Sequence, residues 1–254
     1  MFSVNQHAAE IDASAASQYD RWHEEVHQDD DLDALSLAAW HRSALDLAPP
    51  LNDRDILEVG CGAGDFSISL AHAGANVTGV DFSPRAIELA CEKARRHDQA
   101  IAFRVADAQS LPFADNSFDV LFSCECLEHV PDPRRMLSEL HRVLKPGGVL
   151  VLTTENYSNA LVLGWLVSML RNEPFNSGTC AQPIEHFFLF WRVRKWMRQA
   201  GLAVDRLAGT HHVFLMLPRC HPQAFVKEEF RNRFLARFFR PVARHMAFRA
   251  RKQA

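Results

Sequence analysis

The sequence lacks the cysteine spacing of a disulfide framework or a zinc ribbon. Its six cysteines are scattered along 254 residues, and no two of them form a C-x-x-C pair. They are Cys61, Cys91, Cys124, Cys126, Cys180 and Cys220. Unpaired cysteines are typical of a reducing compartment, so the sequence predicts a cytoplasmic protein.

Long hydrophobic runs are also missing. The longest apolar run, residues 160–170, is about eleven residues long, whereas a helix that spans a bilayer needs about 20. The first residues carry acids and no basic segment followed by an apolar core, which predicts no signal peptide. We therefore expect no transmembrane segment.

Neither sign of charge dominates, because 28 Lys and Arg oppose 31 Asp and Glu for a net charge of −3. The charge is uneven, however. Residues 219–254 hold ten basic and two acidic residues (+8), which leaves 18 basic and 29 acidic residues (−11) in residues 1–218. The acidic majority disfavours a nucleic-acid partner. The basic tail has an apolar stripe at helical spacing from Phe230 to Val242, which fits a helix that covers the sheet or one that contacts an anionic membrane or a phosphorylated substrate.

Short β-rich runs alternate with amphipathic helical patterns from residue 56 onward. The expected strands are residues 56–59, 76–81, 100–107, 118–123, 147–154 and 202–209, and residues 244–252 could form a final edge strand. Helices are expected after Ser83-Pro84, an N-cap followed by proline, and over residues 189–200. This alternation predicts an α/β fold with a parallel sheet. We expect a helical N-terminal cap in residues 1–50 and one domain in residues 51–254, with inserted lids at about 156–185 and 211–242.

A glycine-rich turn follows the first strand. Gly60, Cys61, Gly62, Ala63 and Gly64 precede Asp65, where a dinucleotide fingerprint would have Gly or Ala. An aspartate at a helix N-terminus would repel a pyrophosphate, so a ligand without phosphate is expected.

Acids cluster around that turn. Asp81 ends the second strand, 21 residues after Gly60, where an acid accepts hydrogen bonds from ribose hydroxyls. Glu58, Asp65 and Asp107 add negative charge at the same end of the sheet. The acids predict a site for a cationic nucleoside.

Four motifs in order make the chain resemble the class I S-adenosylmethionine-dependent methyltransferases. They are ILEVGCGAG, VTGVDFS, the stretch VADAQSLPFADNSFDVLFSCECLEHV and RVLKPGGVLVLTT, within residues 56–156. The resemblance implies a Rossmann-like sheet of seven mostly parallel strands in the order 3-2-1-4-5-7-6, with helices on both faces.

The resemblance also assigns cofactor-binding residues. Gly60, Gly62 and Gly64 would lie against the methionine part of the cofactor, and the Ser123 and Cys124 backbone would meet its amine. Asp81 would hold the ribose hydroxyls. Phe82, Asp107 and Ala108 would contact the adenine, and Tyr19 would cover the donor from an N-terminal helix.

Glu125, Glu128 and His129 follow the fourth strand, and on a helical turn positions i, i+3 and i+4 share one face. This set resembles the Glu-x-x-Glu-His motif of demethylubiquinol O-methyltransferases, and small-RNA 2′-O-methyltransferases have a similar one. The resemblance implies a divalent ion, Mg²⁺ by its oxygen ligands, that acidifies an acceptor hydroxyl. Without a metal, His129 would act as a base or position the acceptor. Alternatively, the Glu128-His129 pair would serve only packing and hydrogen bonding. His186, in an H-x-FF-like segment, would face the acceptor as a second candidate base or be a structural histidine.

The predicted function is methyl transfer from S-adenosylmethionine to a small molecule, at a hydroxyl oxygen rather than at nitrogen or carbon. Two alternatives remain. One is an RNA 2′-O-methyltransferase, and the other is a non-catalytic protein that binds S-adenosylmethionine.

Overall fold

The computed structural model describes residues 13–26, 32, 34–156, 184, 186, 188–210, 243 and 245–253. The predicted lids at 156–185 and 211–242 and the C-terminal apolar stripe lie almost wholly outside these residues. Within the described part, no helix is long and apolar enough to cross a membrane.

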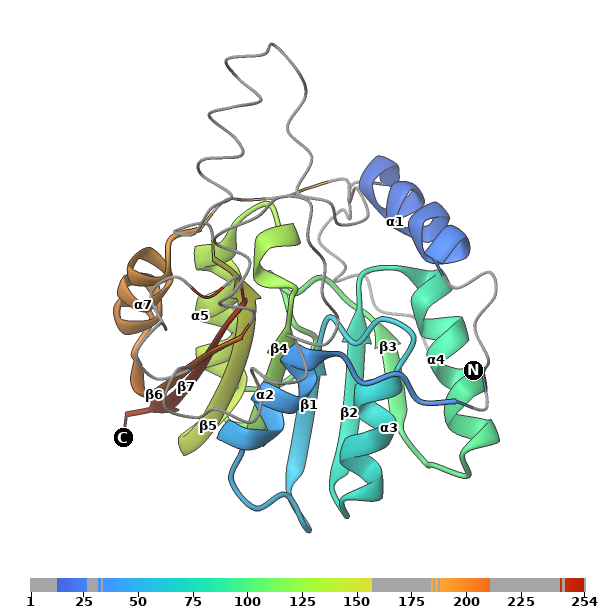
Figure 1. The fold of residues 1–254 in the computed structure, drawn as a ribbon, viewed down its shortest axis with the longest axis horizontal. Helices are drawn as coiled ribbons and strands as arrows, with labels where there is room; N and C mark the ends of the chain where they lie inside the picture. Colours follow the sequence, from blue (N-terminus) through green and yellow to red (C-terminus); the bar gives the residue numbers. More distant parts are fainter. Residues whose placement is uncertain are drawn as a thin grey trace.

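A seven-stranded sheet forms the centre of the protein, in the order β3-β2-β1-β4-β5-β7-β6 (Figure 1). The strands are β1 (Asp55–Val59), β2 (Asn76–Asp81), β3 (Ala102–Val105), β4 (Phe118–Cys124), β5 (Leu144–Glu155), β6 (Leu202–Thr210) and β7 (His245–Lys252). Strands β1 to β5 pair in parallel, and β7 is antiparallel to both β5 and β6. The predicted fold and strand order are confirmed.

One expectation about the last strand is wrong. Residues 245–252 do form a strand, but it lies between β5 and β6 and not at an edge of the sheet. Its first six residues are all buried, because both of its sides are paired and both of its faces are covered. The last strand in the sequence, β7, therefore occupies an interior position in the sheet.

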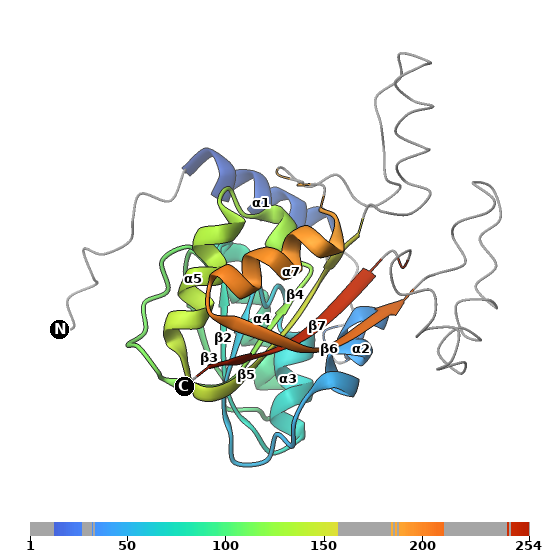
Figure 2. The same cartoon turned by 90° about the vertical axis from the view of Figure 1, so that its left-hand side faces the viewer.

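Helices lie on both faces of the sheet (Figure 2). Helices α2 (Ala39–Leu47) and α3 (Asp65–His72) pack on one face, and α5 (Pro133–Val143) and α7 (Phe190–Gln199) pack on the other. Helix α4 (Pro84–Arg96) contacts α3, β2 and β3. It begins as predicted, with the Ser83 hydroxyl accepting a hydrogen bond from the Ala86 N–H and with proline in its first turn.

Helix α1 (Ala13–Val26) is attached to the N-terminus of α4. The Asp20 carboxylate accepts hydrogen bonds from the Ser83 hydroxyl and from the Arg85 N–H, the latter at 3.2 Å. A carboxylate is favourable there because the first N–H groups of a helix have no partner within the helix. This contact places α1 above the carboxyl ends of the strands.

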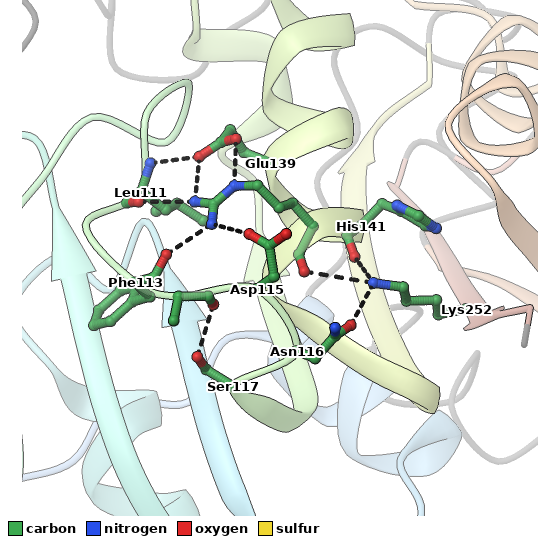
Figure 3. A network of polar contacts seen from close by, with 10 residues as sticks. Leu111, Phe113, Asp115, Asn116, Ser117, Glu139, His141 and Lys252 are labelled. Carbon is green, nitrogen blue, oxygen red and sulfur yellow. Dashed lines mark hydrogen bonds and ion pairs between the residues drawn. The ribbon is translucent and has the colours of Figure 1, made fainter.

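Arg142, in the last turn of α5, fixes the connection between β3 and β4 (Figure 3). Its guanidinium donates to the carbonyls of Leu111 and Phe113 at 2.9 and 2.7 Å and pairs with Glu139 and Asp115. Lys252 of β7 donates to Asn116 Oδ1 and to the His141 carbonyl, both at 2.8 Å. The connection between β3 and β4, residues 106–117, is thereby held to α5 and β7.

Candidate functional site

The glycine turn between β1 and α3 depends on three glycines in the left-handed region. Gly60, Gly62 and Gly64 have φ angles of +78°, +50° and +85°. A Cβ atom would come within 2.7 Å of Cys126 Cβ at Gly60 and within 2.9 Å of Ala90 Cβ at Gly64. At Gly62 the nearest atom would be His23 Cε1, at 3.8 Å. The backbone at Gly62 is therefore open to a ligand, whereas the other two glycines are required by packing.

Asp81, at the end of β2, is attached to this turn. Its carboxylate accepts hydrogen bonds from the Gly62 N–H at 2.8 Å and from the Ser83 N–H at 3.0 Å. Asp107 lies two residues beyond β3, and its carboxylate accepts from the Gln109 N–H at 2.8 Å and from the Gln109 side-chain amide at 3.1 Å. Backbone donors thus orient both acids at the same end of the sheet.

A cavity of about 690 Å³ opens at this end. Its lining includes most of the residues predicted to bind a cofactor, and α1 adds Trp22 and His23 to Tyr19. The predicted residues in the lining are Tyr19, Glu58, Gly60, Cys61, Gly62, Asp81, Phe82, Asp107, Ala108 and Cys124. Gly64 and Ser123 are not part of the lining. Ser123 is buried behind Cys124 in β4.

Tyr19 connects α1 to both sides of the cavity. Its hydroxyl donates to the His129 carbonyl at 3.3 Å, and its ring meets the Phe82 ring edge-on at 6.2 Å between centroids. Burial raises the pKa of the Tyr19 hydroxyl above its ordinary value, so the phenol keeps its proton. The tyrosine therefore acts as a hydrogen-bond donor that holds α1 over the cavity.

Buried acidic groups line the floor of the cavity in their neutral forms. Burial raises the pKa of Glu58 to about 8, and the carboxyl group is hydrogen-bonded to the Ser67 hydroxyl. Burial likewise raises the pKa values of the Cys61, Cys124 and Cys126 thiols. These cysteines therefore act as small apolar groups.

The repulsion expected from Asp65 is largely cancelled by an ion pair. Lys93 of α4 is 1 % exposed, and its Nζ lies 2.8 Å from Asp65 Oδ2. The other carboxylate oxygen accepts a hydrogen bond from the Ser36 N–H at 2.8 Å. The argument that Asp65 repels a pyrophosphate is therefore incomplete, because it omitted the lysine 28 residues further along the chain.

The predicted acceptor-side set has a different geometry from the one expected. Residues 127–129 form a 3₁₀ turn, and Glu125 lies before it with a left-handed φ of +50°. The three side chains do not share a helix face. This expectation is wrong because the i, i+3, i+4 rule holds within a regular α-helix.

Each member of that set has a separate partner. Glu128 is 1 % exposed and accepts from the Thr154 hydroxyl at 2.8 Å, and burial raises its pKa to about 8. His129 lines the cavity, with Nδ1 at 2.6 Å from the Ile184 carbonyl. The His186 N–H donates to the Glu128 carbonyl at 2.8 Å, and its ring stacks on Phe188.

Glu125 instead meets residues that the sequence did not single out. Its Oε2 lies 2.9 Å from Nδ1 of His245, the first residue of β7, and Glu155 ends β5 nearby. Trp40 and His41 of α2 also line the cavity and were missed. A strand pattern contains no signal for His245, since its role depends on the strand that lies beside it.

The fold and the cavity define a doubly wound α/β protein with its ligand site at the carboxyl ends of the parallel strands. Residues 57–152 match a family described as a methyltransferase domain. A "Ubiquinone biosynthesis O-methyltransferase" of Coxiella burnetii is 32% identical over 168 residues, which are 64% of this chain and 69% of that protein. One of the same name from Xanthomonas axonopodis pv. citri is 30% identical over 82% of this chain and 85% of its own. The chain therefore belongs to the S-adenosylmethionine-dependent methyltransferases.

Solved structures show the same fold. An S-adenosylmethionine-dependent methyltransferase from Mesorhizobium loti has a TM-score of 0.59 at 21% identity and covers 87% of this chain and all (100%) of its own. The [4+2]-cyclase SpnF has a TM-score of 0.67 at 21% identity, covering 94% of this chain and 96% of its own. At such identities these likenesses concern the fold alone.

Proposed function

We propose that the chain transfers the methyl group of S-adenosylmethionine to a hydroxyl oxygen of a small molecule. The observation that carries the donor half is the attachment of Asp81 to Gly62 on the wall of a 690 Å³ cavity. The relatives named O-methyltransferases support the acceptor half. Because these names refer to ubiquinone biosynthesis, the class of acceptor that we propose is a hydroxylated ring related to a quinone.

In this proposal the donor lies along the glycine turn. The open backbone at Gly62 receives the methionine part, and the amine lies against the backbone of Cys124, which lines the cavity, whereas Ser123 does not. Asp81 accepts hydrogen bonds from the ribose hydroxyls, and Phe82, Asp107 and Ala108 surround the adenine. Tyr19 closes the cavity from α1, where its hydroxyl is bonded to the His129 carbonyl.

His129 is the proposed base for the acceptor hydroxyl. A carbonyl oxygen only accepts hydrogen bonds, so in the neutral ring Nδ1 carries the proton that points to Ile184. Nε2 then holds the lone pair and can take a proton. The sulfonium donor needs no further activation. The protein therefore has to align the acceptor for in-line attack and to remove the proton of the acceptor hydroxyl.

The predicted magnesium set, Glu125, Glu128 and His129, does not fit one ion in this geometry. Glu128 is engaged with Thr154, and neither Glu128 nor His129 belongs to a group of three potential metal ligands within the described residues. We therefore derive no step through an ion at that set. The expected lids at 156–185 and 211–242 lie almost wholly outside the described residues, so the proposed mechanism does not use them.

Calorimetric titration with S-adenosylmethionine, S-adenosylhomocysteine and NAD tests the donor half. We expect both sulfur compounds to bind more tightly than NAD, and tighter NAD binding would refute the assignment. Mass spectrometry of a panel of catechols, hydroquinones and amines tests the acceptor half. Methylation confined to amines would refute oxygen transfer while leaving the donor site intact.

A further inference from the structure

Three side chains from three strand ends meet beside the donor cavity. Glu125, Glu155 and His245 each offer one ligand atom, and these atoms all lie within 4.8 Å of one another. Glu155 and His245 are buried, and the Glu125 side chain is 14 % exposed. Among the described residues, this is the group that could hold a metal ion.

The sheet register produces this meeting. Glu155 of β5 and His245 of β7 are direct cross-strand partners, so their side chains leave the sheet on the same face. Glu125 follows β4, and its N–H donates to the Thr153 carbonyl at 3.1 Å. The Trp40 ring packs against the His245 ring at 5.1 Å between centroids and limits its rotation. Glu155 and His245 are thus held within the sheet, and Glu125, in the bend after β4, is tied to β5 by its backbone hydrogen bond.

We propose that Glu125, Glu155 and His245 bind a divalent transition-metal cation. Two carboxylates and one imidazole suit Mn²⁺ or Zn²⁺ better than Mg²⁺, which prefers oxygen ligands alone. Three protein ligands leave coordination positions for water or substrate, and Glu125 also lines the donor cavity. The cation takes the position of the proton between His245 Nδ1 and Glu125 Oε2, and that proton moves to Nε2 of a neutral imidazole or to solvent from an imidazolium.

The charges of the cluster favour a divalent cation. Buried charges interact more strongly than exposed ones, so a divalent ion placed between the Glu125 and Glu155 carboxylates would be attracted to both. His245 contacts Glu125 at 2.9 Å and would supply the third ligand. Such binding does not depend on which acceptor the protein uses.

The proposal can be tested by titrating metal-free protein with Mn²⁺. Electron paramagnetic resonance measures the concentration of free Mn²⁺ at each step. We expect one Mn²⁺ site per chain. Glu155→Gln and Glu125→Gln should each weaken it by about tenfold or more, since even residues that only support a metal ligand have effects of that size. Zn²⁺ should compete for the site.

Glu128→Gln is the matched control, because Glu128 belongs to the sequence motif but not to this cluster. Its carboxyl accepts hydrogen bonds from the Thr154 hydroxyl at 2.8 Å and from the Glu155 N–H at 3.4 Å. A glutamine amide can keep both contacts, because its oxygen can accept from the Glu155 N–H while its NH₂ donates to the Thr154 hydroxyl oxygen. Unchanged Mn²⁺ affinity in Glu128→Gln together with loss in Glu155→Gln would support the proposal. Absent Mn²⁺ binding, wild-type affinity in Glu155→Gln, or equal loss in Glu128→Gln would overturn it. Circular dichroism reports whether each variant is folded, independently of the metal, and S-adenosylhomocysteine affinity does the same for Glu155→Gln and Glu128→Gln, whose residues do not line the donor cavity.

Discussion

Lys93 of α4 reaches across to Asp65, the first residue of α3, with 2.8 Å between Nζ and Oδ2. The lysine is 1 % exposed, so the pair connects two helices at the base of the glycine turn. A buried charge without its partner is costly, because the interior solvates it poorly. The pair therefore contributes to the position of α3 relative to α4 as well as to the local charge.

Replacement of Lys93 tests this contribution. We expect Lys93→Met to lower the free energy of unfolding by about 3 kcal/mol, because it leaves the Asp65 carboxylate without its cation. Urea denaturation measures the change. The double variant Asp65→Asn/Lys93→Met should recover part of the loss, and equal stability of Lys93→Met and the wild type would show that the pair is not structural.

Asp81 should affect donor binding more than folding. We expect Asp81→Asn to weaken S-adenosylhomocysteine binding by roughly 1 to 3 kcal/mol, since an amide cannot accept hydrogen bonds through its nitrogen. Isothermal titration calorimetry measures the dissociation constant. Asp46→Asn, an exposed aspartate on α2, serves as the control and should bind like the wild type. Wild-type affinity in Asp81→Asn would remove Asp81 from the proposed ribose site.

Glu58 should make stability depend on pH. Its pKa is raised from 4.5 to about 8 in the fold, so the folded chain keeps a proton that the unfolded chain has released. Stability should therefore fall as the pH rises from about 5 to about 8, by up to ~1.4 kcal/mol for each pH unit. Glu58→Gln, which keeps an acceptor for Ser67, should flatten this dependence.

Urea denaturation at a series of pH values measures the Glu58 effect. Glu128, whose pKa burial also raises from 4.5 to about 8, acts in the same direction as Glu58, and His41, whose pKa burial lowers from 6.5 to about 4, acts in the opposite direction between these two values. Comparison of Glu58→Gln with the wild type at each pH cancels these contributions. Glu24→Gln, on the exposed side of α1, is the matched control. Parallel curves for Glu58→Gln and the wild type would contradict the prediction.

His129 should affect turnover and not donor affinity. We expect His129→Gln to lower kcat by about 10²- to 10⁴-fold, the usual contribution of a general base. The pH dependence of kcat should flatten in the variant, a change that a purely structural histidine would not cause. The exposed His72 offers a control as His72→Gln, which should keep wild-type kinetics. A normal kcat in His129→Gln would assign proton removal to another group, with His186 the next candidate.

Local sequence patterns determined most of the secondary structure, and at the cavity they determined the glycine turn and the position of Asp81. The strand and helix alternation, the N-cap at Ser83 and the glycine turn depend on neighbouring residues, and the structure confirms each of them. The order of the strands came from the family resemblance and is also confirmed. Asp81 was predictable because an acid at the end of the second strand must lie near the turn after the first.

Tertiary structure alone decided the partners of two charged groups at the site, Asp65 and Glu125. Lys93 and Asp65 are 28 residues apart, and His245 and Glu125 are 120 residues apart. No periodicity reports such pairs, because a hydrophobic pattern specifies which face of a strand is buried and not which strand lies next to it. The insertion of β7 between β5 and β6 brought His245 to Glu155, and the 3₁₀ turn at 127–129 separated Glu128 from Glu125. The groups of the proposed metal site therefore depend on strand placement, whereas the glycine turn and the proposed donor residue Asp81 follow from local sequence.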